Sequence, residues 1–166
     1  MRFEHTGLPS PISAEQTAAA AALIRKYSLY AMGCGLIPAP IIDMLAVTAL
    51  EVRMIQDLSK VYQFQFPRKL VVYKIVLSLL GSIAPVYFSN KLKSGVKALP
   101  GVGLIAASGL LAAVNGASVY AVGKVFMRHF ESGGTFLSSD NAVIRRFFNE
   151  SYAEGKQLLP ALASPA

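Results

Sequence analysis

The segment from Leu58 to Phe130 runs for 73 residues without an Asp or Glu, yet it contains nine Lys and Arg residues. A soluble domain spreads both charge signs over its surface, whereas a membrane segment excludes charge from the hydrocarbon and collects Lys and Arg at its edges. The whole chain is 54% hydrophobic, above the usual soluble range of roughly 45–50%. These features predict that the middle of the chain lies in a lipid bilayer.

Helix start and stop signals divide the first part of the chain into two helices. Ser13 and Gln16 have the spacing of a capping box before an alanine-rich run, which predicts a helix over residues 13–32. Gly and Pro residues between positions 33 and 40 predict a turn near 37–39, followed by a second helix over 41–62. In the later half of this helix, apolar residues at helical spacing alternate with a polar set, which we place on the opposite face: Glu51, Arg53, Asp57 and Lys60.

Two later segments reach the length needed to cross a bilayer, about 20 apolar residues. They are residues 70–89, with Lys74 as the single internal charge, and residues 104–122, which carry no charge. A polar loop over 132–140 follows, and Asp140 is placed to cap an amphipathic helix that we expect to end at Gly155. The predicted fold is all-α: a membrane-embedded four-helix bundle of two helical hairpins plus a short amphipathic C-terminal helix.

The predicted domain organisation follows from these elements. Residues 1–12 form a flexible N-terminal segment, 13–131 the membrane-embedded helical domain, 132–157 the loop and the cytoplasmic amphipathic helix, and 158–166 a loose tail. Residues 30–50 either span the membrane or re-enter it as a hairpin. The re-entrant arrangement puts thirteen Lys and Arg on one side and three on the other, and the positive-inside rule favours it. Both termini are then cytoplasmic.

Two polar residues stand within apolar surroundings. Asp43 lies in an otherwise uncharged stretch, and an intramembrane carboxylate costs roughly 2.5–3.5 kcal/mol on insertion scales. It either caps the second helix just after Pro40, which we favour, or forms a polar intramembrane site. Asn115 is the second such residue and has the chemistry for an interhelical hydrogen bond.

Small residues recur at spacings of three and four along residues 104–122 and just beyond. In a membrane such a stripe lets two helix backbones approach closely, which is a main driver of helix association. We expect mainly intrachain packing, with some oligomerisation. The stripe consists of Ala106, Gly109, Ala113, Gly116, Tyr120 and Gly123.

Basic and aromatic residues near the apolar segments predict contact with lipid headgroups or with a protein partner. Each Lys or Arg near an anionic membrane surface contributes about 1 kcal/mol. For the aromatic residues, the alternative of equal weight is packing back onto the bundle. The set is Lys60, Arg68, Lys69, Lys124, Arg128, Arg145, Arg146, Phe147 and Phe148.

The formal charge of +7 suits nucleic acid, anionic lipid or an acidic protein, but the basic residues flank apolar runs, so we expect no nucleic acid. A single cysteine, Cys34, excludes an intrachain disulfide and a cysteine zinc site. A match to the dinucleotide-binding pattern G-x-G-x-x-A is formed by Gly101, Gly103 and Ala106, but we reject it because no predicted strand precedes these residues. The sequence also contains no P-loop motif. We therefore expect no bound nucleotide, no cofactor, no metal and no catalytic residues.

Three stretches resemble one known family. They are residues 24–27 (IRKY), residues 33–43, which contain the pattern I-P-x-P-x-x-D, and residues 99–103 (LPGVG). Over residues 20–131 the chain is similar to the bacterial GTPase-associated membrane family known as domain of unknown function 697. The resemblance implies a helical module of the bacterial inner membrane, coupled to a GTPase. This chain has no G domain of its own, which leaves a separate GTPase as a partner.

The sequence thus predicts a non-enzymatic integral membrane module that acts as an anchor or assembly subunit for a partner, either a GTPase or a larger membrane complex. The expected partners are anionic lipid headgroups and a protein partner or a second copy of the chain. The alternative is an oligomeric channel or transporter-like conduit that uses Asp43.

Overall fold

The structure is a computed structural model that describes residues 12–34, 40–65, 76, 78 and 102–163. These described residues form four long helices and one short 3-10 helix: α1 (Ala14–Cys34), α2 (Pro40–Val61), α4 (Val102–Glu131), η1 (Phe136–Ser138) and α5 (Asn141–Ala163). The described part of the chain contains no strand, so the predicted all-α class is confirmed there. The helix predicted over 70–89 lies outside the described residues, except that Val76 and Ser78 are helical.

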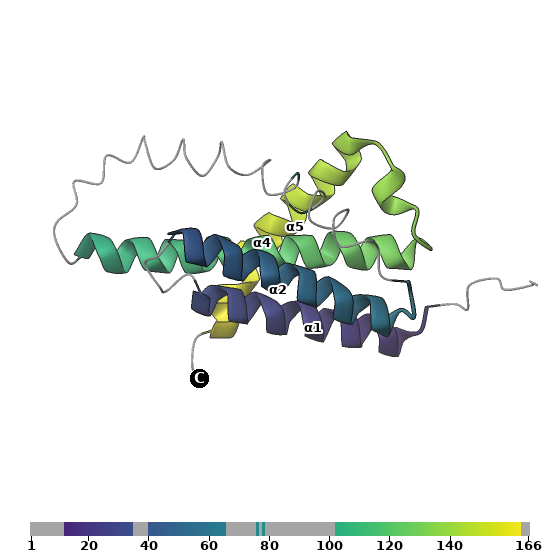
Figure 1. Cartoon of the computed structure of the whole chain (residues 1–166), viewed down its shortest axis with the longest axis horizontal. Coiled ribbons are helices and arrows are strands. Elements are labelled where there is room, and N and C mark those ends of the chain that lie inside the picture. Colours follow the sequence, from purple (N-terminus) through teal and green to yellow (C-terminus); the bar gives the residue numbers. More distant parts are fainter. Residues whose placement is uncertain (1–11, 35–39, 66–75, 77, 79–101, 164–166) are drawn as a thin grey trace, which may run out of the picture.

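The helices surround α4, which packs most extensively against α5 and α1 (Figure 1). α1 and α2 form an antiparallel hairpin, and α2 and α4 run in the same direction along it. α5 returns from the end of α4 and crosses behind it at a steeper angle. The first predicted hairpin is therefore present, and its predicted turn at 37–39 lies outside the described residues.

The start of α1 is closed by the predicted capping box. The Gln16 backbone N–H donates to Ser13 Oγ at 3.1 Å, and the Ser13 backbone N–H donates to Gln16 Oε1 at 3.1 Å. The Gln16 side-chain amide also donates to the carbonyl of Val61 at 3.1 Å. One glutamine thus caps α1 and satisfies a carbonyl at the end of α2, which ties the two helix ends together.

The turn after α4 contains two glycines in the left-handed region, Gly133 with φ +66° and Gly134 with φ +87°. The N–H of Gly134 donates to the carbonyl of His129 at 2.8 Å, which satisfies one of the last carbonyls of α4. Asp140 then caps α5, as predicted, because its Oδ1 accepts the N–H of Ala142 at 2.8 Å.

The predicted end of the last helix was wrong. α5 continues through Gly155 to Ala163, so residues 158–163 are helical and not a loose tail. The reason lies in tertiary packing: a β-carbon at Gly155 would lie 3.0 Å from Tyr120 Cδ1 and 3.2 Å from the Ala117 Cα of α4. Gly155 permits a close helix crossing, and Leu159, which is 1% exposed, holds the following turn in the core.

Two glycines of α4 have the same role on its other sides. A β-carbon at Gly123 would lie 2.8 Å from Ile24 Cγ1 of α1 and 3.1 Å from Met54 Sδ of α2. One at Gly116 would lie 2.5 Å from Met32 Cγ of α1. The glycines therefore mark the places where α4 and its neighbours approach closely within one chain.

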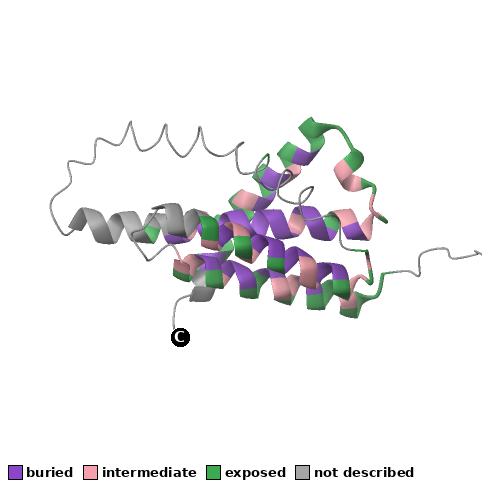
Figure 2. Cartoon of the chain, in the orientation of Figure 1, coloured by how far each residue is buried: buried purple, intermediate pink, exposed green. Residues whose placement is uncertain are grey.

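The core is built from apolar residues on the facing sides of all four helices (Figure 2). The largest side chains with less than 2% exposure include Ile24, Met54, Leu58, Phe126 and Phe148. Together they form one continuous cluster.

Among the described residues, one charged residue is buried in this core. Glu51 of α2 is fully buried, and neither of its carboxylate oxygens has a hydrogen-bond partner among the described residues. Its assignment to the polar face of the helix was wrong, whereas Arg53 and Lys60 are exposed as predicted. Burial raises the pKa of Glu51 to about 8, because an ionised carboxylate is poorly solvated there. At neutral pH this residue is therefore largely protonated.

We predict opposite effects for two alanine substitutions in α4. Gly123→Ala should lower the free energy of unfolding by about 1–3 kcal/mol, because the new methyl group overlaps Ile24. Gly109→Ala is the matched control: Gly109 is exposed with nothing within 4 Å, so the higher helix propensity of alanine should leave stability unchanged or raise it by about 0.5–1 kcal/mol. Denaturant unfolding followed by circular dichroism measures both. Equal effects would contradict the proposed close approach.

Glu51 predicts a pH dependence of stability. Between pH 4.5 and about 8 the folded state keeps a proton that the unfolded state releases, so stability should fall as pH rises, on the order of 1 kcal/mol per pH unit, and then level off. Glu51→Gln should flatten this slope between pH 6.5 and 8, and Glu150→Gln, at an exposed residue, should not. His129 contributes with the opposite sign, because burial lowers its pKa and the unfolded state then binds more protons near pH 6.5. This contribution is common to all variants, so it cancels when Glu51→Gln is compared with the unmodified chain. A slope that is identical in the Glu51 variant would show that Glu51 is not its source.

Candidate functional site

Charged residues gather at one end of the helical bundle. α1 has no charge after Lys26, α4 none before Lys124, and α5 none after Lys156. Because α1 and α5 run opposite to α2 and α4, these uncharged ends lie together (Figure 1). The charged residues of α2 from Glu51 onward also lie away from these uncharged ends, and Asp43, near the start of α2, is the exception.

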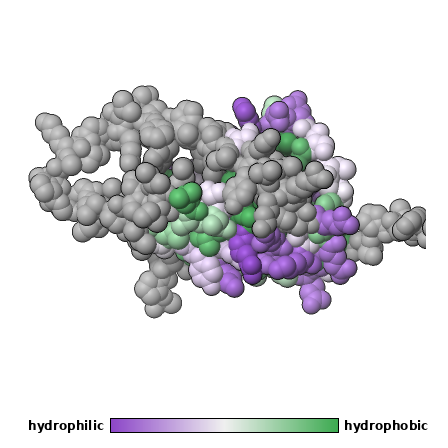
Figure 3. Space-filling model, viewed as in Figure 1, coloured by the Kyte–Doolittle hydropathy of each residue, from purple (hydrophilic) through white to green (hydrophobic). Residues whose placement is uncertain are grey.

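The uncharged end also exposes large apolar side chains. Tyr30 near the end of α1 is 52% exposed, Leu45 near the start of α2 is 63% exposed, and Leu158 near the end of α5 is 44% exposed. In Figure 3 hydrophobic surface lies on the described atoms toward this end, and hydrophilic surface dominates along the lower right. We call this region the uncharged end; it is the candidate site of membrane contact.

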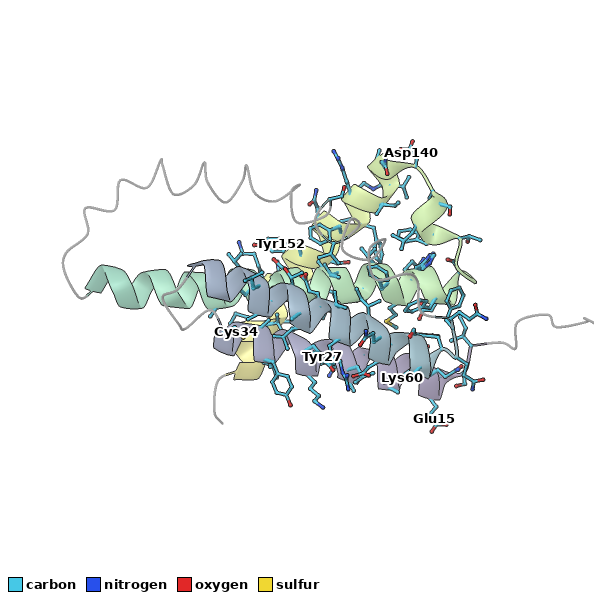
Figure 4. The ribbon with its side chains drawn as sticks, viewed as in Figure 1. Glu15, Tyr27, Cys34, Lys60, Asp140 and Tyr152 are labelled. Atoms are coloured by element: carbon cyan, nitrogen blue, oxygen red, sulfur yellow. The ribbon has the colours of Figure 1, made fainter. Side chains whose placement is uncertain are left out.

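The side chains show the same division of the bundle. Figure 4 places Cys34 at the uncharged end and Glu15, Lys60 and Asp140 toward the opposite end. We call that opposite end the charged end. The contrast between the two ends is a property of the folded chain, because it arises only when the last turns of α1 and α5 lie beside the first turns of α2 and α4.

None of the helices, judged over the described residues, combines the length and the apolar character required to cross a membrane. The crossing predicted for residues 70–89 lies outside the described residues, apart from Val76 and Ser78. The crossing predicted for 104–122 falls in α4, where most side chains before Ala112 also lie outside them.

Three tyrosine hydroxyls tie neighbouring elements together by donating to carboxylates. Tyr27 of α1 donates to Asp57 of α2 at 2.6 Å. Two further bonds join the end of α2 to α4 and α4 to α5: Tyr62 to Glu131 at 3.0 Å and Tyr120 to Glu154 at 2.8 Å. The Tyr27 hydroxyl, followed by Lys60, holds the pKa of Asp57 below its usual value, and burial is the main cause that raises the pKa of Tyr62.

A groove of about 320 Å³ lies between the charged halves of α4 and α5. We call it the α4–α5 groove. Its lining comes from one face of each helix: Lys124, Met127, Arg128 and Glu131 of α4, and Phe147, Glu150, Ser151 and Glu154 of α5. Among the described residues, no group of three or more His, Cys, Asp or Glu is arranged to hold a metal ion.

The two polar residues predicted near the membrane lie on different helices, Asp43 on α2 and Asn115 on α4. Asn115 is 9% exposed in the middle of α4. Asp43 lies in the first turn of α2, and its side chain is outside the described part of the chain. Neither the capping role nor the polar-site role of Asp43 is tested by the described contacts.

The predicted small-residue stripe divides into two halves. Gly116, Tyr120 and Gly123 are buried against α1, α2 and α5 of the same chain. Gly109 is exposed, Ala113 is half-buried, and the side chain of Ala106 lies outside the described residues. The buried half of the stripe thus packs within the chain.

The predicted basic contacts are spread over three helices. Lys60 is exposed and lies 2.9 Å from Asp57. Lys124 and Arg128 line the α4–α5 groove, whereas Arg145 and Arg146 are exposed on α5. Arg68 and Lys69 lie outside the described residues.

The aromatic residues of α5 pack onto the bundle. The sequence had left this open as the alternative to contact with lipid or a partner. Phe148 is fully buried, and Phe147 is half-buried with its ring 5.4 Å from that of Phe136. Phe148 therefore presents no surface to lipid or to a partner in this structure.

Sequence reasoning missed three features: buried Glu51, the tyrosine–carboxylate bonds, and Ser151 in the α4–α5 groove. Glu51 lies four positions after Val47 and four before Ile55, and both of these apolar residues are on the buried side of α2, so this spacing was the available signal. The hydrogen bonds join residues 30 to 69 positions apart, so no local pattern predicts them.

Comparison with known proteins gives a relative and a family. The chain is 32% identical over 154 residues to "Magnetosome membrane protein 22" of Magnetospirillum gryphiswaldense, a match that covers 92% of this chain and 78% of the relative. No solved structure is significantly similar. A family model matches residues 8–157, a wider range than the 20–131 expected from the sequence. The chain therefore belongs to the family described as Domain of unknown function (DUF697).

Proposed function

We propose that this protein is a non-enzymatic membrane module that serves as an anchor or assembly subunit for a partner. The observation that carries this proposal is the separation of charge along the bundle, with the uncharged end opposite the charged end. In the proposed arrangement the uncharged end contacts lipid, and the charged end lies in water or against the partner.

The free energies favour this orientation. Tyr30, Leu45 and Leu158 are exposed at the uncharged end, and full burial of one large apolar side chain contributes about 1.5–3 kcal/mol. Lys124 and Arg128 lie where the charged half of α4 begins, and each cation near an anionic surface contributes about 1 kcal/mol. Several such contributions together favour membrane association of the helical bundle as it is folded here.

The relative supports the same location, because its name describes a membrane protein and the match extends over 92% of this chain. The finer parts of the sequence interpretation belong to this proposal: a multi-pass arrangement in the bacterial inner membrane, both termini in the cytoplasm, and a GTPase or larger membrane complex as partner. The topology is supported by the distribution of Lys and Arg along the chain, and the inner membrane and the GTPase partner are what the resemblance noted in the sequence implies.

Membrane contact through the uncharged end predicts that one exposed leucine matters and that a comparable valine does not. Leu45→Gln should reduce the partition of the full chain into vesicles about tenfold, the equivalent of losing about 1.4 kcal/mol of apolar burial. Val143→Gln is the matched control, since Val143 is 51% exposed at the charged end. Both substitutions leave the net charge unchanged. Flotation after detergent removal measures the bound fraction. Equal partition of the two variants, or failure of the unmodified chain to float, would overturn membrane contact at this end.

An anchor also predicts a partner. Crosslinking the full chain in its native membrane, followed by detergent purification, should recover one protein in an amount comparable to the chain itself. The GTPase interpretation requires that this protein contain a nucleotide-binding domain. Recovery of the chain alone, together with ion conductance in proteoliposomes, would contradict the anchor proposal.

A further inference from the structure

Two cations in the α4–α5 groove have no ion-pair partner among the described residues. Lys124 and Arg128 are one helical turn apart on the same face of α4. Three carboxylates line the same groove, yet none lies within ion-pair distance of either cation. Lys124 Nζ lies over the Tyr120 ring, 6.0 Å from its centroid, and Arg128 is exposed, so both cations remain open to an anionic ligand.

Other residues hold the carboxylates in place. Glu131 accepts a hydrogen bond from Tyr62, Glu154 accepts one from Tyr120, and Glu150 lies 3.5 Å from Arg146. Each of these contacts uses one carboxylate oxygen, Oε1, and leaves Oε2 without a hydrogen bond among the described residues. The groove therefore keeps positive and negative groups separate, and both have unused bonding capacity.

Ser151 adds an independent sign of a ligand. The residue lines the groove and is only 3% exposed, and its hydroxyl makes no hydrogen bond within the described part of the chain. Among the described residues the fully buried side-chain atoms without a partner are the two Glu51 oxygens, so the Ser151 hydroxyl oxygen keeps some exposure. A ligand or a water in the groove can therefore bond to it.

These groups suit a small molecule that carries an anion and a primary ammonium together. Two cations one turn apart match a phosphate, which accepts several charge-assisted hydrogen bonds. Carboxylates match an ammonium with N–H donors. A trimethylammonium group has no N–H to donate, so the groove should distinguish ethanolamine from choline.

The position of the groove points to a lipid as the source of this chemistry. Lys124 is the first charged residue after the uncharged stretch 102–123 of α4, so the groove begins where the uncharged end stops. If the uncharged end contacts lipid, the groove lies at the level of the headgroups.

We propose that the α4–α5 groove binds a phosphoethanolamine headgroup, with its phosphate on Lys124 and Arg128, its ammonium on the carboxylates, and Ser151 at its floor. This inference rests on the proposed membrane contact and names its lipid class. Both phosphoethanolamine and phosphocholine lipids are zwitterionic, so a preference between them does not arise from net vesicle charge.

The test compares partition of the full chain into vesicles of phosphatidylcholine alone and into vesicles with half of it replaced by phosphatidylethanolamine. The unmodified chain should partition about five- to tenfold better into the second. Arg128→Gln and Ser151→Ala should abolish this preference. Lys156→Gln is the control, because Lys156 is exposed on α5 outside the groove, and it should keep the preference. Unfolding curves of all variants check that they fold.

Soluble glycerophosphoethanolamine separates the two sources of the ligand. It should compete with vesicle binding and bind in calorimetry, with glycerophosphocholine inactive in both. Binding of this compound with loss in Arg128→Gln, but without vesicle binding, would support the groove and its chemistry, assign a free ligand to it, and overturn the membrane proposal. Equal partition into both vesicle types, or a preference retained in Arg128→Gln and Ser151→Ala, would overturn the groove proposal while leaving membrane contact intact.

Discussion

The close approach of α4 to its neighbours is the constraint on which the rest of the structure depends. Gly116 and Gly123 of α4 and Gly155 of α5 each lie where a β-carbon would come within about 3 Å of a neighbouring helix. Side chains at these points would push the helices apart and open the core around Phe126 and Phe148. The uncharged end and the α4–α5 groove both exist because α4 is held in contact with three other helices.

Polar contacts add specificity to this packing. The three tyrosine–carboxylate bonds each join different elements, and they hold carboxylates in fixed places at or near the surface. Glu51 is the opposite case, a carboxyl group buried without a hydrogen-bond partner in the described part of the chain, and it remains in the core because burial keeps it protonated. One set of acidic residues is therefore fixed by tyrosine hydroxyls, while Glu51 is held in the core in an environment that raises its pKa.

Local signals were sufficient wherever the deciding contacts are close in sequence. The capping box of Ser13 and Gln16 and the cap by Asp140 were predicted correctly because each involves residues at most three positions apart. The end of α5 was predicted incorrectly because glycine commonly ends a helix, and only the contact of Gly155 with Tyr120 explains why it does not do so here. The sequence could not decide whether Phe148 contacts lipid, contacts a partner or packs onto the bundle, because the surface against which it packs comes from other helices.

The sequence by itself determined the helical class, the family, most helix starts and the exclusion of charge from long segments. These follow from residue types and spacings that act within a few turns of one helix. Only the tertiary structure decided that the uncharged segments share one end, that Glu51 is buried, and that Lys124, Arg128 and Ser151 line one groove. The physical reason is that helix direction and close packing bring together residues far apart in the chain, and this depends on the shapes of facing surfaces, which no single segment contains.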